Sequence, residues 1–177
     1  NAATQTIEVT VEDNTNPTIT CPSNLTISYC DPVAEFNVTA DDNCANVNLT
    51  QTSGPASGST FPVGTTTVSF TATDAGGNVA NCSFTVSRPA DLLPNLVQED
   101  AKCFGENDGS ASVAPTGGAS PYTYLWDTGD ITPGVTGLEA GDYTVSITDA
   151  SGCVSVQDVT IGQPPLLVTS LVEVQNE

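Results

Sequence analysis

Apolar and polar residues alternate along much of this chain. The alternating stretches are residues 4–11, 36–40, 68–73, 80–86, 122–126, 143–147 and 155–161. Alternation with a period of two and one apolar face is typical of half-buried β-strands that pack on a second sheet. No stretch repeats its apolar residues with the period of about 3.6 residues that an amphipathic helix requires. The pattern therefore predicts an all-β chain.

Three of these stretches end in a segment that contains proline. They are residues 4–11 before Pro17, residues 80–86 before Pro89 and Pro94, and residues 155–161 before Pro164 and Pro165. Because proline cannot continue a central strand, each ending indicates a closing strand followed by a linker. The repetition predicts tandem modules of roughly 70–80 residues, which is the size of a small β-sandwich.

The linkers set the expected module boundaries. These are 1–13 as the final strand of a preceding module, 17–88 as a complete module, 89–93 as a linker, 94–163 as a second module and 164–177 as the start of a following repeat. Asn1 falls inside a pattern, without a Met or an apolar leader. We therefore expect the chain to be a segment of a longer exported protein.

Composition and charge exclude several classes of function. The chain has 177 residues with 21 Asp and Glu, 2 Lys and Arg and no His, which gives a formal net charge of −19. Binding to nucleic acid needs a basic surface, so no nucleic-acid partner is expected. Catalysis and metal binding by histidine are impossible. The apolar runs are too short to cross a bilayer, so no membrane span is expected in this segment.

Six cysteines point to disulfide bonds outside the reducing cytosol. They are Cys21, Cys30, Cys44, Cys82, Cys103 and Cys153, and none forms the close CxxC pair that a zinc site favours. A bond from Cys21 to Cys82 would join the first strand of a module to its last and leave Cys30 to pair with Cys44. A bond from Cys103 to Cys153 would close the second module in the same way. Each bond that closes a long loop would stabilise the folded module by roughly 3–4 kcal/mol.

The first module resembles the hyalin repeat (HYR) family. The matching residues are 17–22, 42–44, 53–54, 61–68, 72–78 and 82–86. The resemblance covers nearly the whole module and implies an immunoglobulin-like sandwich associated with extracellular adhesion. Together with the linkers it predicts two tandem immunoglobulin-like β-sandwich modules in an elongated array.

The second module is similar to the SprB repeat of gliding-motility adhesins of Bacteroidetes. The matching residues are 103–105, 107–111, 117–118, 120–126, 129, 138–145 and 148–153. The resemblance implies a giant cell-surface protein, exported by the type IX secretion route and built as a filament of repeats. The expected partners are neighbouring repeats of the same chain, with surface polysaccharide or other cell-surface proteins as further candidates.

The aromatic residues on alternating positions are expected to form the cores. They are Trp126, Tyr124 and Tyr143 in the second module and Phe70 and Phe84 in the first. The alternative for Trp126 is a sugar-stacking platform with Tyr122 and Tyr124. A tryptophan on an alternating strand is more typical of the core of a sandwich.

Acidic turns offer oxygen ligands for calcium, the one cofactor that the sequence suggests. The first candidates are Glu12, Asp13, Asp42 and Asp74. The competing interpretation is that Asp and Asn in turns bind their own backbone. No catalytic residues are expected, because the single Asp127-Thr128-Gly129 tripeptide lacks the second carboxylate that an aspartic protease needs.

Together with these patterns, the two resemblances imply a non-enzymatic structural or adhesive segment of a large repetitive cell-surface adhesin or gliding-motility filament, located extracellularly. Its modules would act as disulfide-stapled spacers. Two alternatives remain open at this point. One is a carbohydrate- or calcium-binding module of a secreted protein. The other is a self-assembling filament subunit in which a loose terminal strand completes a neighbour's sheet.

Overall fold

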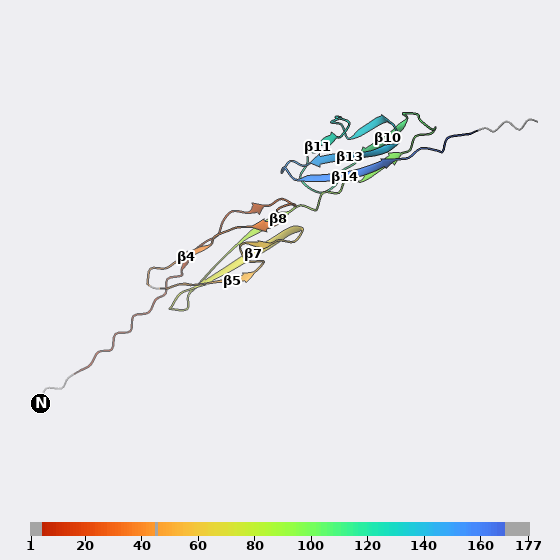
Figure 1. Ribbon diagram of the computed structural model, residues 1–177. Coiled ribbons are helices and arrows are strands. Elements are labelled where there is room, and N and C mark those ends of the chain that lie inside the picture. The colour runs from red at the N-terminus through yellow and green to blue at the C-terminus, as the bar shows by residue number, and fades with distance from the viewer. Residues whose placement is uncertain (1–4, 45, 169–177) are drawn as a thin grey trace, which may run out of the picture. The chain divides into compact units, whose positions relative to one another are not determined.

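The structure is a computed structural model that describes residues 5–44 and 46–168 (Figure 1). Within these residues it contains strands and no helix, which confirms the predicted all-β class. The strands are β1 (Thr18–Thr20), β2 (Leu25–Thr26), β3 (Val33–Ala34), β4 (Thr39–Asp41), β5 (Asn48–Ser53), β6 (Ser59–Thr60), β7 (Gly64–Thr73), β8 (Val79–Arg88), β9 (Leu96–Glu99), β10 (Gly109–Val113), β11 (Thr123–Trp126), β12 (Gly134–Leu138), β13 (Gly141–Thr148) and β14 (Val154–Ile161).

The chain divides into two compact units. The first comprises Asn1–Ile27 and Asp31–Arg88, and the second comprises Ser28–Cys30 and Pro89–Glu177. The second unit therefore includes three residues that lie, in sequence, between β2 and β3. The described parts of the two flanking segments, residues 5–13 and 164–168, form no strand. Residues 1–4 and 169–177 lie outside the described residues, so the assignment of 1–13 and 164–177 to neighbouring repeats stays a prediction.

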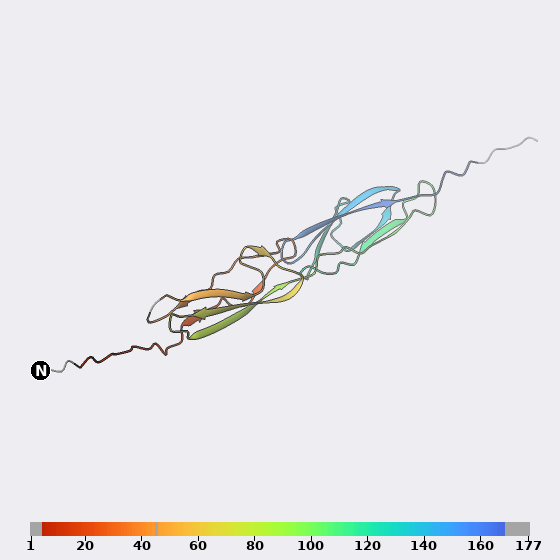
Figure 2. The same ribbon diagram turned by 90° about the horizontal axis from the view of Figure 1, so that it is seen from below.

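The first unit is organised around the long antiparallel pair of β7 and β8, which run side by side in Figure 1 and Figure 2. Its largest sheet has the order β2-β8-β7-β5, in which β2 runs parallel to β8 and the other neighbours are antiparallel. The pairs β1-β4 and β3-β6 form two smaller sheets. The alternation seen in the sequence places Val68, Phe84 and Val86 inside, all of them buried.

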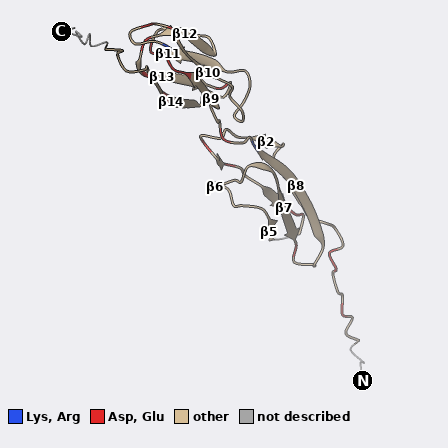
Figure 3. Cartoon of the chain, turned by 90° about the vertical axis from the view of Figure 1, so that its right-hand side faces the viewer, with Lys and Arg blue, Asp and Glu red and all other residues tan. Residues whose placement is uncertain are grey.

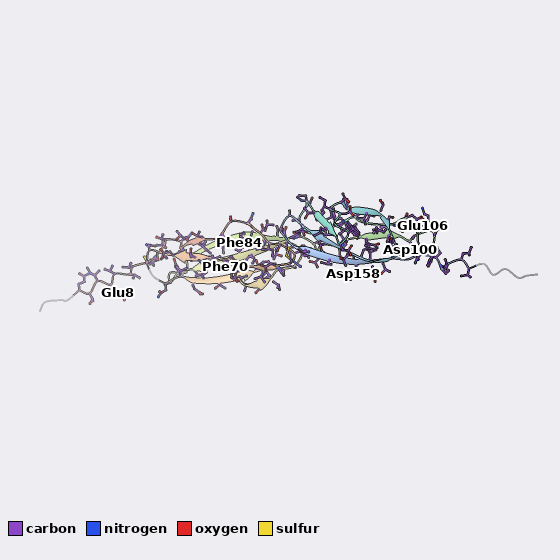
Figure 4. The ribbon with its side chains drawn as sticks, turned by 45° about the horizontal axis from the view of Figure 1, so that its top comes forward. Glu8, Phe70, Phe84, Asp100, Glu106 and Asp158 are labelled. Carbon is purple, nitrogen blue, oxygen red and sulfur yellow. A yellow bond between two sulfur atoms is a disulfide. The ribbon has the colours of Figure 1, made fainter. Side chains whose placement is uncertain are left out.

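Aromatic side chains complete the core of the first unit. The rings of Phe36 and Phe84 meet edge to face with their centroids 4.9 Å apart, and Phe61 and Phe70 make similar contacts with Phe36. Figure 4 labels Phe70 and Phe84, which lie on the neighbouring strands β7 and β8. Both were predicted to be core residues, and both pack in this cluster.

The strand predicted over residues 36–40 is present only from Thr39. The Phe36 backbone N–H donates to Ser57 Oγ at 2.8 Å, and the Ser57 hydroxyl donates to the Phe36 carbonyl at 2.8 Å. Side-chain hydrogen bonds thus occupy the backbone groups that a sheet ladder would have used. The apolar alternation survives there, because Phe36 and Val38 still pack against the core.

The second unit consists of two three-stranded antiparallel sheets, β12-β10-β9 and β11-β13-β14. Its core draws side chains from both sheets, including Trp126, Val145 and Ile147. Trp126 is 1% exposed, and its indole N–H donates to the Thr132 carbonyl at 2.9 Å. Tyr124 and Tyr143 are half-buried against the same cluster, as predicted. The burial of Trp126 leaves its ring no free face for stacking on a sugar.

Candidate functional site

A disulfide bond joins Cys21 to Cys82 in the first unit. Cys21 directly follows β1, and Cys82 lies in β8 opposite Phe70 of β7. The two Cα atoms are 6.0 Å apart, and the bond closes a loop of 61 residues. The predicted pairing of these two cysteines is confirmed. It ties the start of the sandwich to its last strand, so the ends of this unit cannot separate while the bond is intact.

The second disulfide joins Cys30 to Cys153, with a Cα–Cα distance of 5.9 Å and a sequence separation of 123 residues. The predicted bonds Cys30–Cys44 and Cys103–Cys153 are therefore wrong. Cys44 and Cys103 are free and exposed. The physical reason is the placement of Ser28–Cys30, which belongs to the second unit although the chain on both sides belongs to the first. The alternation of apolar and polar residues does not reveal that a short segment between two strands of one unit packs in the other unit.

Tyr29 helps to fix this segment in the second unit. Its side chain packs against the core cluster that contains Trp126 and Ile147. Burial raises the pKa of the Tyr29 phenol, and the negative charges of Asp149 and Asp91 raise it further. The phenol therefore stays protonated and neutral at physiological pH, which suits a group that packs against apolar side chains.

Asp149 fixes the backbone of Cys153, the other cysteine of this disulfide. Asp149 is 5% exposed, and its carboxylate accepts hydrogen bonds from the backbone N–H groups of Ala119 at 2.9 Å, Ser151 at 2.8 Å and Cys153 at 3.0 Å. Burial alone would raise the pKa of Asp149, but these N–H donors outweigh it and lower the pKa below its usual 3.8. The ionised Asp149 thus organises the turn between β13 and β14 and places Cys153 for bonding.

A cluster of acidic residues in the first unit matches part of the predicted calcium site. Ligand atoms of Asp13, Asp42 and Cys44 all lie within 4.8 Å of one another. Asp13 is held in place by Asn78, whose side-chain amide donates to the Asp13 carbonyl at 3.0 Å. Gly76 allows the close approach, because a Cβ there would sit 2.9 Å from the same carbonyl oxygen.

Asp42 is the half-buried member of this cluster that has an unpaired carboxylate oxygen. Its Oδ2 accepts the Cys44 backbone N–H at 3.0 Å. Its Oδ1 is shielded from solvent and has no hydrogen-bond partner among the described residues. A shallow hollow beside it is lined by further oxygen-bearing residues, namely Thr15, Asn16, Thr18, Asp41 and Asn43. Hard oxygen donors of this kind suit calcium or magnesium.

The other two predicted ligands do not join the cluster. Glu12 is exposed and lies outside the group of close ligand atoms. Asp74 is occupied within its own turn, where it accepts hydrogen bonds from the Asn78 amide side chain at 2.9 Å and the Asn78 backbone at 2.8 Å. The Asn78 side-chain bond is the main reason that the pKa of Asp74 is lowered. Asp74 therefore behaves as the backbone-binding turn residue that the competing interpretation described.

Cys44 is the member of the cluster that the sequence did not reveal, because the cysteine pattern predicts a disulfide for it. Partial desolvation raises the pKa of its thiol, as do the charge of Asp13 and a hydrogen bond to its carboxylate. A protonated thiol is a poor nucleophile and a poor metal ligand. A hard cation could therefore bind only to the carboxylates of Asp13 and Asp42 and to neighbouring oxygen atoms. The two carboxylates alone supply fewer than the 6–8 oxygen ligands that calcium takes.

Asp127, the acidic residue of the Asp-Thr-Gly tripeptide, is also used structurally. Its Oδ2 accepts a hydrogen bond from the Thr144 backbone N–H at 2.9 Å, which secures the turn after β11 to β13.

Acidic residues, red in Figure 3, occur on both units. No helix long and apolar enough to cross a bilayer is found in the part of the chain that the structure describes.

Models of two protein families match part of each unit. The family model of the HYR domain matches residues 12–87, and that of the SprB repeat matches residues 95–131. The two matches follow one another along the chain, the HYR domain first and the SprB repeat second. Both resemblances noted in the sequence are confirmed.

The curated relatives include hyalin and a serine-rich adhesin. Hyalin of Strongylocentrotus purpuratus is 36% identical over 141 residues, which cover 70% of this chain and 11% of hyalin. The serine-rich adhesin for platelets of Staphylococcus aureus (strain MSSA476) is 25% identical over 126 residues, or 64% of this chain and 5% of the adhesin. The chain therefore spans only a small fraction of each relative.

The solved structures that match include a desmocollin ectodomain and a fragment of titin. The human desmocollin-1 ectodomain gives a TM-score of 0.39 at 14% identity, over 92% of this chain and 39% of that one. A three-immunoglobulin-domain structure of titin gives 0.42 at 12% identity, over 83% and 65% respectively.

Proposed function

We propose that this chain is a non-enzymatic spacer segment of a long, repetitive cell-surface adhesin or gliding-motility filament. The single observation that carries the proposal is the succession of an HYR domain and an SprB repeat in a chain with two long-range disulfides. Export by the type IX route and a source among the Bacteroidetes belong to the same proposal. They follow from the resemblance of the second unit.

The chemistry of the modules supports a structural role. The buried acidic groups Asp74 and Asp149 bind backbone N–H groups, and Trp126 fills a core. Small sandwiches bury a limited core, so covalent closure contributes a large share of their resistance to unfolding. A net charge of −19 keeps the surface soluble and discourages pairing between exposed strand edges.

The test is an exchange of modules in the intact parent protein within its own cells. Residues 12–163 are deleted in one strain and replaced in a second strain by two unrelated sandwich repeats of equal length. Surface display is measured by protease shaving of intact cells, and adhesion and spreading are measured in parallel. A spacer predicts weaker adhesion after deletion and recovery after replacement. Adhesion that the replacement cannot restore contradicts the spacer role, and protection of the segment from protease on intact cells contradicts the surface location.

A second candidate function, binding of calcium, is favoured by the solvent-shielded Oδ1 of Asp42 beside Asp13. Isothermal titration of the whole chain with calcium chloride tests it, with magnesium chloride as the comparison. Saturable binding that Asp42→Asn abolishes and Glu12→Gln leaves intact would support a site at the cluster. Binding that both variants weaken equally, or that never saturates, would show general attraction of cations to an acidic chain.

A further inference from the structure

We propose that the Cys30–Cys153 disulfide is a covalent bypass that carries tension past residues 31–152. The inference deepens the proposed spacer role, and its biological use rests on that role. The bypass itself is a property of the isolated chain and can be tested without it.

The order of the bonded residues along the chain defines the bypass. Cys30 precedes β3, and Cys153 directly precedes β14. When the two ends of the chain are pulled, tension passes from residue 1 to Cys30, across the sulfur–sulfur bond, and from Cys153 to residue 177. The strands β3 to β13 and the segment 89–93 lie outside this path, so force on the ends does not extend them.

The two disulfides are interleaved, which makes the path independent of the first bond. Cys21 lies before Cys30, and Cys82 lies between Cys30 and Cys153. A route through Cys21–Cys82 would still have to traverse all of the chain from residue 82 to the end. The shorter route through Cys30–Cys153 therefore sets the maximum extension with or without the Cys21–Cys82 bond.

In the described part of the tension path, residues 5–30 and 153–168, the strands are β1, β2 and β14. The longest of these, β14, is already extended. In β14 the chain rises about 3.3 Å per residue, close to the limit of about 3.6 Å for a fully stretched chain. Pulling between Cys153 and the end of β14 thus gains little length. Tyr29 and Asp149 hold the two ends of the bypass against the second unit.

The connectivity gives definite lengths. With the bypass, about 53 residue-to-residue steps remain between the ends, or about 190 Å at full stretch. With Cys21–Cys82 alone, about 115 steps remain, or about 410 Å. With both bonds reduced, the whole chain of 177 residues extends to roughly 630 Å.

Single-molecule force spectroscopy of the full chain, held by handles at its two ends, tests the bypass with three paired variants. Cys30→Ser with Cys153→Ser should lengthen the full extension by about 220 Å, since the path then runs through Cys21–Cys82. Cys21→Ala with Cys82→Ala should leave the extension at about 190 Å. Cys44→Ser with Cys103→Ser should also leave it unchanged, because both thiols are free.

Two outcomes overturn the bypass. The first is a longer extension for the Cys44/Cys103 variant, which would mean that Cys103 bonds to Cys153 and shortens the path. The second is an unchanged extension for the Cys30/Cys153 variant. Neither outcome bears on surface location or adhesion, which are read in cells. A failure of the bypass is thereby distinguished from a failure of the proposed function.

Discussion

Removing the Asp149 carboxylate should loosen the last hairpin of the second unit. The buried side chain binds three backbone N–H groups, from Ala119, Ser151 and Cys153. Asp149→Ala leaves those of Ala119 and Cys153 without an acceptor in half-buried and buried positions. At about 1–3 kcal/mol for each of the two orphaned donors, the expected loss of stability is about 2–6 kcal/mol. Asp149→Asn keeps one acceptor oxygen and should cost about 1–2 kcal/mol.

The same carboxylate predicts how stability depends on pH. Its pKa is lowered in the folded protein relative to the usual 3.8. The ionised Asp149 therefore contributes its full stabilisation above the unfolded pKa, and this contribution is lost as the pH falls through the folded pKa. In Asp149→Asn the group no longer titrates, so the second unit should lose less stability between pH 5 and about pH 2 than the wild type does.

Urea unfolding followed by Trp126 fluorescence measures both effects. Trp126 is the only tryptophan in the chain and is buried in the second unit, so its signal reports that unit. Asp158→Ala is the matched control, because Asp158 is an exposed acid on β14, labelled in Figure 4. It should shift stability by less than about 0.5 kcal/mol. A similarly small shift for Asp149→Ala, or an unaltered pH dependence for Asp149→Asn, would refute the reasoning.

Three further predictions address the first unit and the free thiols. Gly76→Ala places a methyl group 2.9 Å from the Asp13 carbonyl oxygen and should speed amide hydrogen exchange around Asp13; unchanged exchange would contradict the close approach. Phe36→Ala removes three edge-to-face ring contacts and should destabilise the first unit by about 3–4 kcal/mol in calorimetry, and a loss below about 1 kcal/mol would argue against them. Native protein should react with two molecules of N-ethylmaleimide, one at Cys103 and one at Cys44. The reaction at Cys44 should be slower, because its raised pKa keeps the thiol protonated. An intact mass with no adduct, or with more than two, would be inconsistent with two free thiols.

The strands of the large sheets were predictable from the sequence because they are long and half-buried. Val68 and Ala72 in β7, and Phe84 and Val86 in β8, alternate with polar residues and are buried as expected. Residues 36–40 were less predictable. Ser57 binds both backbone groups of Phe36, and no local pattern around Phe36 signals a partner 21 residues away.

The cysteine pairing shows where sequence reasoning stops. Cys21 and Cys82 could be paired because Cys21 directly follows the first strand of the module and Cys82 lies in its last strand. Cys30 could not, since its partner depends on the excursion of Ser28–Cys30 into the second unit. Six cysteines allow about 15 pairings, and spacing alone does not choose among them. Tyr29 was the one residue that could have indicated this placement, because a large aromatic side chain in a short connection between strands needs a core to pack against.

The acidic cluster was predictable only in part. Asp13 and Asp42 come together as expected, although 29 positions separate them in the chain. Asp74 does not join them, because Asn78 supplies its hydrogen bonds within one turn. Turn-forming and metal-binding carboxylates have the same sequence signature, and only the positions of the donors separate them.

A single proteolytic cut provides the most direct test of the covalent bypass. Lys102 is the only lysine of the chain and lies between Cys30 and Cys153. The thiols are first blocked with N-ethylmaleimide, and the denatured, unreduced chain is then cleaved by a lysine-specific protease. The account predicts that fragments 1–102 and 103–177 remain joined on a non-reducing gel and separate only after dithiothreitol. Separation without reductant, as the pairs Cys30–Cys44 and Cys103–Cys153 would give, would contradict it.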